Sequence, residues 1–477
     1  MGALRQLRPE DIPPHIVEVC KRLHAAGFQA WLVGGAVRDL LRGSARGAKD
    51  FDVATSAQPA EVTQVFGKKR TIPTGEQHGT VTVLVDRPDG EREPVEITTF
   101  RGEGAYTDGR RPDSVEFVRS LVEDLKRRDF TMNAIAYDAV TDRIEDPFDG
   151  RVDLADGLIR AVGDPLARFG EDGLRAMRAV RFAAQLGFRL DPPTEAAIAQ
   201  TIDVFKKVSA ERVRDELVKI LSSERPSVGL ELMRTTGLLE ACIPELTEGV
   251  GFHQNRWHKH DVWSHTLAAV DATVLHSPTA APWVPRMAAL LHDVAKPRTA
   301  APKENDPADN TFYRHEILGA EMSDEICRRL KLSTKEREHV VNLVRNHMFW
   351  YSAEWSDGTV RRFISRVGTD AIDDLFALRE GDVRGRGRGE EPGTEVDELK
   401  RRVKDQLASA AAIKVGDLAV SGGDVMRILQ CRPGPIVGEI LRRLLERVLD
   451  DASLNTKEHL EPLVRELGRE LAPGAPA

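Results

Sequence analysis

The sequence predicts an α/β region at the N-terminal end of the chain and helices over most of the remainder. Short apolar or alternating segments typical of strands cluster before residue 155, whereas later segments carry apolar residues at helical spacing. The chain has 477 residues, more than a single hydrophobic core usually organises. We therefore expect four parts: an α/β head (1–155), a helical neck (156–255), a second helical domain (256–385), and a linker with a helical tail (386–477).

The expected elements of the head begin with a helix over Ile16–Ala26. Ala36–Leu41 also has helical spacing, while the apolar period of Phe130–Tyr137 allows either helix or strand. Four segments have strand character: Gln29–Val33, Phe51–Ala54, Thr80–Val85 and Val95–Phe100. The last two flank the turn-rich Arg87–Gly90 and predict a hairpin.

The strand signals fade after the head. Three neck helices are expected, over Glu171–Gln185, Ala210–Leu221 and Val228–Glu240. A histidine-rich helical region follows, over Trp257–Asp382. Arg384–Glu395 is rich in Arg and Gly and predicts a flexible linker, after which Val396–Ala411 predicts a charged helix.

Composition narrows the class of protein. The net charge is −8, so nucleic-acid binding would require local basic patches, and Lys126–Arg128 and the arginines of Arg175–Arg181 are candidates. The four cysteines are far apart and form neither a zinc pattern nor a disulfide framework, which is typical of a reducing cytosol. No apolar segment approaches membrane-spanning length. We expect a soluble cytoplasmic protein without a membrane partner; its oligomeric state stays open.

Two aspartates one residue apart, Asp50 and Asp52, follow a Gly-Gly turn. Alternate side chains of a strand share a face, so the two carboxylates should lie side by side, where clustered oxygens suit Mg²⁺. Glu96 on another strand is the best third carboxylate for displacement at phosphorus. Asp-x-Asp alone also occurs on solvated edge strands. The preceding turn favours the catalytic interpretation, because Gly35 permits close backbone approach and the Arg38 guanidinium can fork onto phosphate oxygens.

A second pattern places Asp172, Arg175, Arg178 and Arg181 at intervals of three residues, along one side of the expected helix. A solvated basic face is one interpretation. Another follows from base chemistry, since cytosine and adenine both present an exocyclic amine next to a ring-nitrogen acceptor. A carboxylate accepts from the amine and a guanidinium donates to the ring nitrogen, so one Asp and one Arg can select C and A without a nucleic-acid template.

Four motifs occur in order: Leu32–Asp39, Lys49–Thr55, Arg127–Ala134 and Glu171–Arg175. Over roughly residues 28–245 the chain resembles the class II CCA-adding tRNA nucleotidyltransferases, which share a polymerase-β-like head. The resemblance implies template-independent addition of CCA to the tRNA 3′ end from CTP and ATP. It also implies a flexible loop at Arg101–Pro112 that serves the final A.

The resemblance also assigns roles to single residues. Asp50 and Asp52 would hold Mg²⁺, and Arg128 and Asp129 would contact the sugar-phosphate part of the nucleotide. Asp172 and Arg175 would select the base, with Arg178 and Arg181 nearer the phosphates and the helix framework.

The second half contains an ordered set of His265, His292-Asp293 and Asp382. Such residues on different helices can converge in a bundle core as a metal site. Over roughly residues 260–385 the set resembles the HD superfamily of metal-dependent phosphohydrolases. His315 and His347 match positions that add a second metal in some members. Imidazole–carboxylate sites favour Ni²⁺, Mn²⁺ or Co²⁺ over Mg²⁺. The substrate would be a 2′,3′-cyclic phosphate or another phosphoester, and a vestigial site is the alternative.

Three rival functions remain at this point. A bacterial poly(A) polymerase shares the head and neck, and an A-only adding tRNA nucleotidyltransferase is poorly separated by sequence. A non-catalytic RNA-binding protein on a transferase scaffold is the third rival. The presence of Asp50, Asp52, Glu96 and Arg38 argues against the last.

Overall fold

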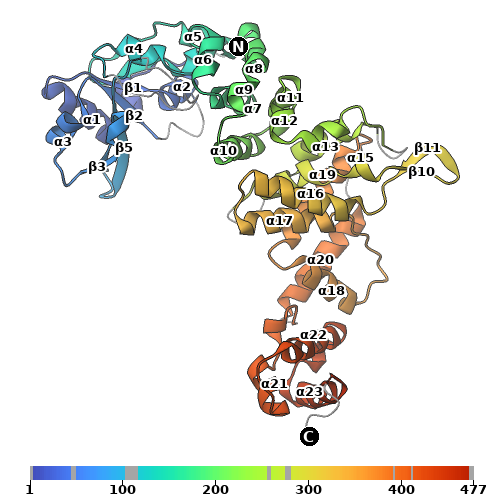
Figure 1. Cartoon of the computed structure of the whole chain (residues 1–477). Helices are drawn as coiled ribbons and strands as arrows, with labels where there is room; N and C mark the ends of the chain where they lie inside the picture. Colours follow the sequence, from blue (N-terminus) through green and yellow to red (C-terminus); the bar gives the residue numbers. More distant parts are fainter. Residues whose placement is uncertain are drawn as a thin grey trace. The chain divides into compact units, whose positions relative to one another are not determined.

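The computed structural model describes residues 4–43, 50–102, 117–254, 259–273, 281–389, 393–409 and 412–471 (Figure 1). The chain divides into two compact units, Met1–Pro244 and Glu245–Ala477, and each is described by itself. The expected α/β head and most of the expected helical neck fall in the first unit, which ends before residues 245–255 of the neck. The division into four parts stays a prediction.

The first unit is built on a mixed seven-stranded sheet in the order β3-β4-β5-β2-β1-β6-β7. Only β2 and β5 pair in parallel; the other neighbours are antiparallel, including the expected β4–β5 hairpin. The α/β prediction is therefore confirmed. The strands are β1 (Ala30–Val33), β2 (Asp52–Thr55), β3 (Thr71–Gly75), β4 (Thr80–Asp86), β5 (Arg92–Thr99), β6 (Ala136–Asp138) and β7 (Arg143–Glu145).

Helices surround this sheet: α1 (Pro14–Ala25), α2 (Gly35–Leu41), α3 (Pro59–Phe66), α4 (Leu121–Lys126) and α5 (Gly150–Asp156). All four residues of β1 are buried, which places this strand in the core. The ambiguous segment Phe130–Tyr137 contains a 3₁₀ turn over Thr131–Asn133 and then enters β6. Most of the expected loop Arg101–Pro112 lies outside the described residues.

The neck region is helical apart from the short parallel pair β8 (Leu158–Ile159) and β9 (Arg189–Leu190). The prediction of one helix from Glu171 was wrong: the chain breaks after Glu171, and the next helix starts at Leu174. A Cβ on Gly173 would lie 2.7 Å from the Phe205 backbone, so only glycine fits this break. The helices are α6 (Pro165–Glu171), α7 (Leu174–Leu186), α8 (Pro192–Gln200), α9 (Ile202–Phe205), α10 (Ala210–Leu221), α11 (Pro226–Thr235) and α12 (Leu238–Cys242).

The second unit begins with helices that pack around α13, α14, α17 and α19. A β-hairpin, β10–β11, interrupts them and was not expected. The elements are α13 (Val262–Ala272), α14 (Val284–Leu291), α15 (Lys296–Thr299), β10 (Ala301–Lys303), β11 (Asp306–Thr311), α16 (His315–Arg329), α17 (Thr334–Asn346), α18 (Asp357–Val367) and α19 (Ile372–Gly385).

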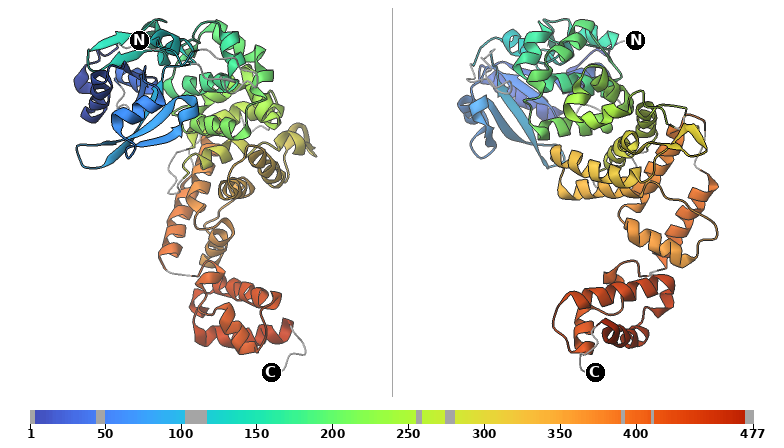
Figure 2. Two further views of the ribbon diagram at one scale, coloured as in Figure 1. Left: turned by 60° about the vertical axis from the view of Figure 1, so that its left-hand side comes forward. Right: turned by 45° about the vertical axis from the view of Figure 1, so that its right-hand side comes forward.

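The C-terminal helices follow: α20 (Thr394–Ala408), α21 (Gly422–Leu429), α22 (Pro435–Asp450) and α23 (Lys457–Leu471). The last three pack on one another around a core that includes Val425, Ile440 and Val464 (red in Figure 2). No helix within the described ranges is both long and apolar enough to cross a membrane.

The prediction of a flexible linker over Arg384–Glu395 was partly wrong. Arg384 and Gly385 belong to α19, and α20 already begins at Thr394. Gly387 packs closely, because a Cβ there would lie 2.2 Å from His260 Nε2. The glycines in this stretch permit close packing as well as turning.

Candidate catalytic and metal sites

Three carboxylates gather where the start of β2 pairs with the middle of β5. Asp52 opens β2 and is the register partner of Glu96 on β5, so both side chains project from the same face of paired strands. Asp50 lies before the strand with φ of +54°, which corrects the expectation that Asp50 and Asp52 alternate along one strand. All three residues are exposed. The structure thus brings Asp52 and Glu96 together, with Asp50 two positions upstream of Asp52.

The Gly-Gly turn approaches these carboxylates through Gly34. This residue has φ of +75°, and a Cβ on it would lie 3.4 Å from Arg128 Nη1 and 3.7 Å from Asp52 Oδ2. Gly35 starts α2, where a Cβ would meet Arg38 Nη2 at 3.5 Å. Gly34 is therefore the position that requires glycine in this turn. Sequence reasoning singled out Gly35 instead.

The charges around Asp52 are unbalanced. Desolvation and repulsion from Glu96 and Asp50 raise the pKa of Asp52 to about 6, with Arg128 acting in the opposite direction. The surroundings of Asp52 therefore disfavour its ionised form. A cation bound between the carboxylates would offset this repulsion and is favoured at the site. The donor set consists of exposed carboxylate oxygens, and it therefore fits Mg²⁺.

A hydrogen-bonded chain joins the turn to the neck. Arg38 donates from Nη1 to Asn133 Oδ1 at 2.9 Å, and Asn133 donates from Nδ2 to Asp129 Oδ1 at 3.0 Å. Arg178 Nη2 lies 2.6 Å from Asp129 Oδ2. Burial opposes ionisation of Asp129, but Arg178 and Asn133 hold its pKa well below the usual range. The network therefore carries an ionised carboxylate between two arginines.

The expected base-selecting residues are also paired within the chain. Arg212 of α10 holds Asp172 through both carboxylate oxygens, at 3.2 and 2.7 Å. Arg175 Nη1 contacts Glu171 Oε2 at 2.5 Å, and its Nη2 donates to the Arg127 carbonyl at 3.1 Å. Asp172 caps the break before α7 rather than lying on the helix, so the four residues do not share one helical face.

The remaining arginine of the series, Arg181, pairs with Glu216 of α10 at 2.6 Å. Its guanidinium carbon lies 3.9 Å from the Phe182 ring centroid, and those of Arg38 and Arg178 lie at 5.0 and 5.5 Å. Phe182 is thus an aromatic contact shared by three arginines.

Four histidines and two aspartates converge inside the second unit. His265, His292 and Asp382 form one candidate metal group, and Asp293, His315 and His347 form another. Within each group the ligand atoms lie within 4.8 Å of one another. The Nε2 atoms are 3.2 Å apart between His265 and His292, and 3.3 Å apart between His315 and His347.

Asp293 lies between these two groups. Its Oδ2 is 3.1 Å from His292 Nε2, and its Oδ1 is 3.5 Å from His315 Nε2. The doublet His292-Asp293 follows the last residue of α14 rather than lying within the helix. All six side chains are buried, and His265 is 0% exposed.

Backbone carbonyls fix the histidine tautomers. The Nδ1 atoms of His292, His315 and His347 lie 2.8, 2.7 and 2.7 Å from the carbonyls of Ala289, Phe312 and Val344. Each Nδ1 donates, so each Nε2 presents a lone pair to the cluster. Burial and the neighbouring His292 and His315 lower the pKa of His347 to about 3, which keeps it neutral. Converging imidazole lone pairs and carboxylates fit divalent metal ions.

Two further side chains complete this cluster. Lys296 Nζ lies 2.6 Å from Asp293 Oδ2 and donates to Gln254 Oε1 at 2.6 Å. Although burial favours its neutral form, hydrogen bonds that His265 donates to the carboxylates of Asp293 and Asp382 raise its pKa to about 9. Lys296 follows the His-Asp doublet by three residues, a spacing that could have drawn attention to it. Sequence reasoning missed it.

Comparison with known proteins decides the family. Residues 30–160 match a model of the poly A polymerase head domain, 187–249 a model of the RNA and SrmB-binding site of polymerase A, and 317–464 a model of tRNA nucleotidyltransferase domain 2. The CCA-adding enzyme of Enterococcus faecalis is 34% identical over 451 residues, covering 93% of each chain. The chain belongs to the class II CCA-adding enzymes of the poly(A) polymerase/tRNA nucleotidyltransferase family.

The fold of this family agrees with the structure. The Bacillus stearothermophilus CCA-adding enzyme in complex with CTP is 31% identical with a TM-score of 0.70, and the match covers 96% of this chain and 99% of that one. The CCA-adding enzyme of Lactobacillus johnsonii is 52% identical over 222 residues, which are 46% of this chain. The chain spans about half the length of the Lactobacillus relatives that it matches at this identity. None of the three matching family models names an HD domain.

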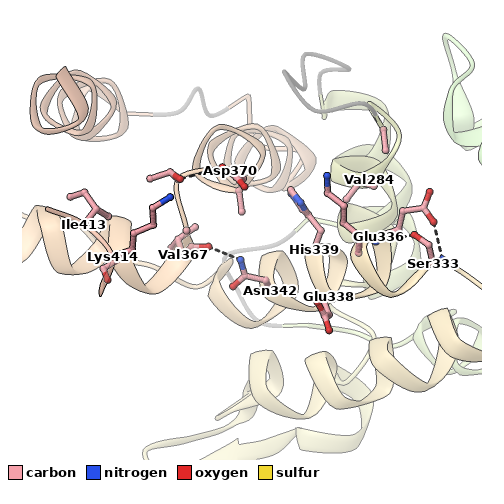
Figure 3. A pocket seen from close by; sticks show the side chains of 16 residues that line it. Val284, Ser333, Glu336, Glu338, His339, Asn342, Val367, Asp370, Ile413 and Lys414 are labelled. Carbon is pink, nitrogen blue, oxygen red and sulfur yellow. Dashed lines mark hydrogen bonds between the residues drawn. The ribbon is translucent and has the colours of Figure 1, made fainter. Parts of the chain in front are cut away.

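A cavity of about 1130 Å³ in the second unit contains none of the expected site residues. His339, Asn342 and Lys414 are among its lining residues (Figure 3). Asn342 Nδ2 donates to the Val367 carbonyl at 2.6 Å, and His339 Nε2 lies 2.9 Å from the buried Asp374 Oδ2. These contacts tie helices together and present no converging ligand set, so we assign the cavity no role in catalysis.

Proposed function

We propose that this chain adds CCA to the 3′ end of tRNA, using CTP and ATP, without a nucleic-acid template. The observation that carries the proposal is the pairing of Asp52, at the start of β2, with Glu96 on the parallel strand β5, beside the Gly34 turn and Arg128. Bound Mg²⁺ supplies charge neutralisation at the attacking and leaving oxygens. Asp50, Asp52 and Glu96 would hold the ions. The enzyme would act in the cytoplasm on a soluble substrate.

The nucleotide would lie between the turn and the neck. Arg38 and Arg128 would bind phosphate oxygens, because a guanidinium offers paired donors. Asp129 orients Arg178 through the contact at 2.6 Å. Asp172 would accept from the amine of C or A, and Arg175 would donate to the ring nitrogen. In the structure both are held by intramolecular partners, which keep them close to the α6–α7 break.

Transcripts of tRNA that end before CCA, after C and after CC test this proposal. Purified protein would receive labelled CTP and ATP separately and together, and the products would be sequenced. We expect two C residues from CTP alone and a single terminal A only after CC. Repeated A addition would support the poly(A) rival, A addition to CC ends without any C addition would support the A-only rival, and no addition would support the RNA-binding rival.

A second activity is favoured by the buried histidine–aspartate cluster. We infer that His265, His292, Asp293 and Asp382 hold a divalent metal ion, and that His315 and His347 with Asp293 hold another. When bound, such ions polarise a phosphoester, and imidazole ligands favour Ni²⁺, Mn²⁺ or Co²⁺. Lys296 keeps a positive charge beside Asp293 at 2.6 Å and could meet a substrate phosphate oxygen. The reaction class would be phosphohydrolysis, for example of a 2′,3′-cyclic phosphate.

Elemental analysis of the purified chain and hydrolysis of 2′,3′-cyclic AMP with each ion test this second proposal. We expect near-stoichiometric transition metal and metal-dependent hydrolysis. Absence of both would make the cluster a vestige that serves only as a scaffold.

A further inference from the structure

Two exposed aromatic side chains lie within three residues of histidines of the buried histidine–aspartate cluster. Tyr313 and Trp350 are 80% and 74% exposed, the highest values among the large hydrophobic side chains of the described residues. Tyr313 precedes His315 by two positions, and Trp350 follows His347 by three. The Nε2 atoms of these two histidines are 3.3 Å apart. Single exposed hydrophobic residues are common, but two beside adjacent ligands of one cluster indicate a binding role.

The segment that carries Tyr313 is fixed by the cluster. The carbonyl of Phe312 accepts from His315 Nδ1 at 2.7 Å, and the Phe312 ring centroid lies 5.6 Å from Lys296 Nζ. Arg314 then adopts φ of +62° at the start of α16. Phe312 therefore holds this segment against the histidine–aspartate cluster, while the side chain of Tyr313 is exposed to solvent. The exposed Arg314 adds a positive charge beside the ring.

The segment that carries Trp350 is fixed by alternating burial. Phe349 and Tyr351 are 7% and 5% exposed, whereas Met348 and Trp350 point outward. The Phe349 ring centroid lies 5.7 Å from the guanidinium carbon of Arg379, whose Nη1 donates to Asp382 Oδ2 at 3.1 Å. The anchor of Trp350 is thus linked to a ligand of the cluster. Trp350 also borders a groove of about 600 Å³ that is lined in addition by Arg362 and Arg366.

We propose that Tyr313 and Trp350 select a nucleoside on the phosphoester that enters the histidine–aspartate cluster, by stacking against its base. This inference rests on the proposed phosphohydrolase activity. The faces of the two aromatic rings fit a base, and the nearby cationic side chains fit its phosphate. Stacking of a base on an aromatic ring increases affinity roughly 5- to 150-fold. The nucleoside could be a free nucleotide or the terminal residue of an RNA, since both present the same base and phosphate.

The test compares substrates that differ only in the base or in the chain attached to it. These are 2′,3′-cyclic AMP, a short RNA ending in a 2′,3′-cyclic phosphate, and methyl riboside 2′,3′-cyclic phosphate, which has no base. In Tyr313→Ala and Trp350→Ala we expect KM to rise roughly 5- to 150-fold for the substrates with a base. The kcat values and the KM for the base-free compound should stay close to wild type. A larger effect with the RNA would identify an RNA end as the source.

Tyr313→Phe and Trp350→Phe keep a ring and should restore the wild-type KM. Met348→Ala is the matched control, because Met348 is 56% exposed in the same segment and has no π-face. Metal content by elemental analysis should be equal in all variants. Calorimetric titration with adenosine 2′-monophosphate, without added metal, provides a readout independent of turnover, and its Kd should weaken by the same factor in the two Ala variants.

An unchanged KM and Kd in both Ala variants, or an equal rise for the base-free compound, would overturn the stacking role while leaving the phosphohydrolase intact. Absence of metal and hydrolysis in the wild type would overturn the proposed second activity. The titration would then still decide whether the two rings bind a nucleoside.

Discussion

The two candidate metal sites of this chain differ in exposure and in ligand type. Asp50, Asp52 and Glu96 are exposed beside the start of β2 and offer only oxygen atoms. His265 and His292 are 0% and 1% exposed and offer imidazole nitrogens, together with buried carboxylates. Mg²⁺ is bound through a few carboxylates and keeps several waters, whereas imidazoles favour transition metals.

This difference in exposure and ligand type predicts how each site would acquire its metal ion. Open carboxylates with an unbalanced charge can accept an ion that arrives with a nucleotide triphosphate and leaves with the product. Backbone carbonyls fix the tautomers of His292, His315 and His347, so the ligand atoms of these three residues are arranged before any substrate binds. We therefore expect an exchangeable ion in the head and resident ions in the helical cluster.

The largest expected effect follows from removing an exposed carboxylate of the head. Asp52→Ala should reduce nucleotide addition by roughly 10³ or more, the scale of losing a charge-stabilising group in phosphoryl transfer. The circular dichroism spectrum should stay unchanged, because the Asp52 carboxylate holds a cation and is not part of the hydrophobic core. Addition is measured by primer extension on tRNA ending in C.

Asp86→Ala is the matched control for this prediction. Asp86 is an exposed carboxylate at the C-terminal end of β4, and its Oδ2 lies 2.7 Å from Arg70 Nη2. Near-wild-type addition by Asp52→Ala, or an equal loss in the control, would refute the catalytic role of the head carboxylates.

Removing ligands from the helical cluster should affect only the second activity. The double variant His292→Ala with Asp293→Ala should lose its transition metal and its hydrolysis of 2′,3′-cyclic AMP, while CCA addition persists. Loss of an outer partner of a ligand already costs 10- to 100-fold in metal affinity, so loss of two ligands should exceed this.

His339→Ala provides the control for the cluster, because His339 also contacts a buried aspartate, Asp374, but lies outside it. Both activities should survive in this variant. Parallel loss of CCA addition in the double variant would show that the two sites depend on each other.

The ion pair between the buried Asp129 and the partly exposed Arg178 predicts how the stability of the first unit depends on pH. The pKa of Asp129 is lowered in the folded state, so its contribution to stability is present above the unfolded value of about 3.9 and is lost as pH falls below it. Arg178→Met should lower the free energy of unfolding by about 2 kcal/mol at neutral pH. This is less than for a fully buried pair, because the Arg178 side chain is 34% exposed.

Hydrogen exchange of the amides in β6 and α7 measures this effect. The difference between wild type and Arg178→Met should shrink below about pH 4. A difference that stays constant with pH would mean that Arg178 stabilises the unit by packing alone, for example on the Phe182 ring at 5.5 Å.

Base selection should respond to changes at the α6–α7 break. Asp172→Ala and Arg175→Ala should each reduce discrimination against UTP and GTP by roughly 1–3 kcal/mol. Arg212→Ala keeps both residues but removes the partner of Asp172, so its loss should be smaller, roughly 0.5–1.5 kcal/mol. Competition between nucleotides at one tRNA end measures these ratios. Equal loss for all four nucleotides would mean that the residues only position phosphate.

Much of this arrangement could be predicted from the sequence, because local chemistry determines it. Strand patterns placed β1, β4 and β5, and spacing placed α10 at its observed bounds. The histidines of the cluster were predicted because their order with Asp293 and Asp382 resembles that of the HD superfamily, and imidazoles and carboxylates are metal ligands. The structure brings His315 and His347 into contact with Asp293, as a site for two metal ions would require.

Other features depend on contacts between distant residues and left no local signal. The helix break at Gly173 depends on the nearby Phe205 backbone. The spacing of apolar residues along the sequence carries no information about this contact. Gly34 rather than Gly35 carries the left-handed turn, since the conformation depends on Arg128 and Asp52. The partners Arg212, Glu216 and Asn133 looked like ordinary polar residues in the sequence. Their roles depend on which helix packs beside which.

The most direct test of the comparison is metal exchange on one preparation with two assays. The protein is treated with a chelator until neither activity remains, and the chelator is then removed. We predict that Mg²⁺ alone restores CCA addition at once but not hydrolysis of 2′,3′-cyclic AMP, which returns only with Ni²⁺, Mn²⁺ or Co²⁺. Recovery of both activities with Mg²⁺ alone, or of CCA addition only after a transition metal is added, would contradict the account.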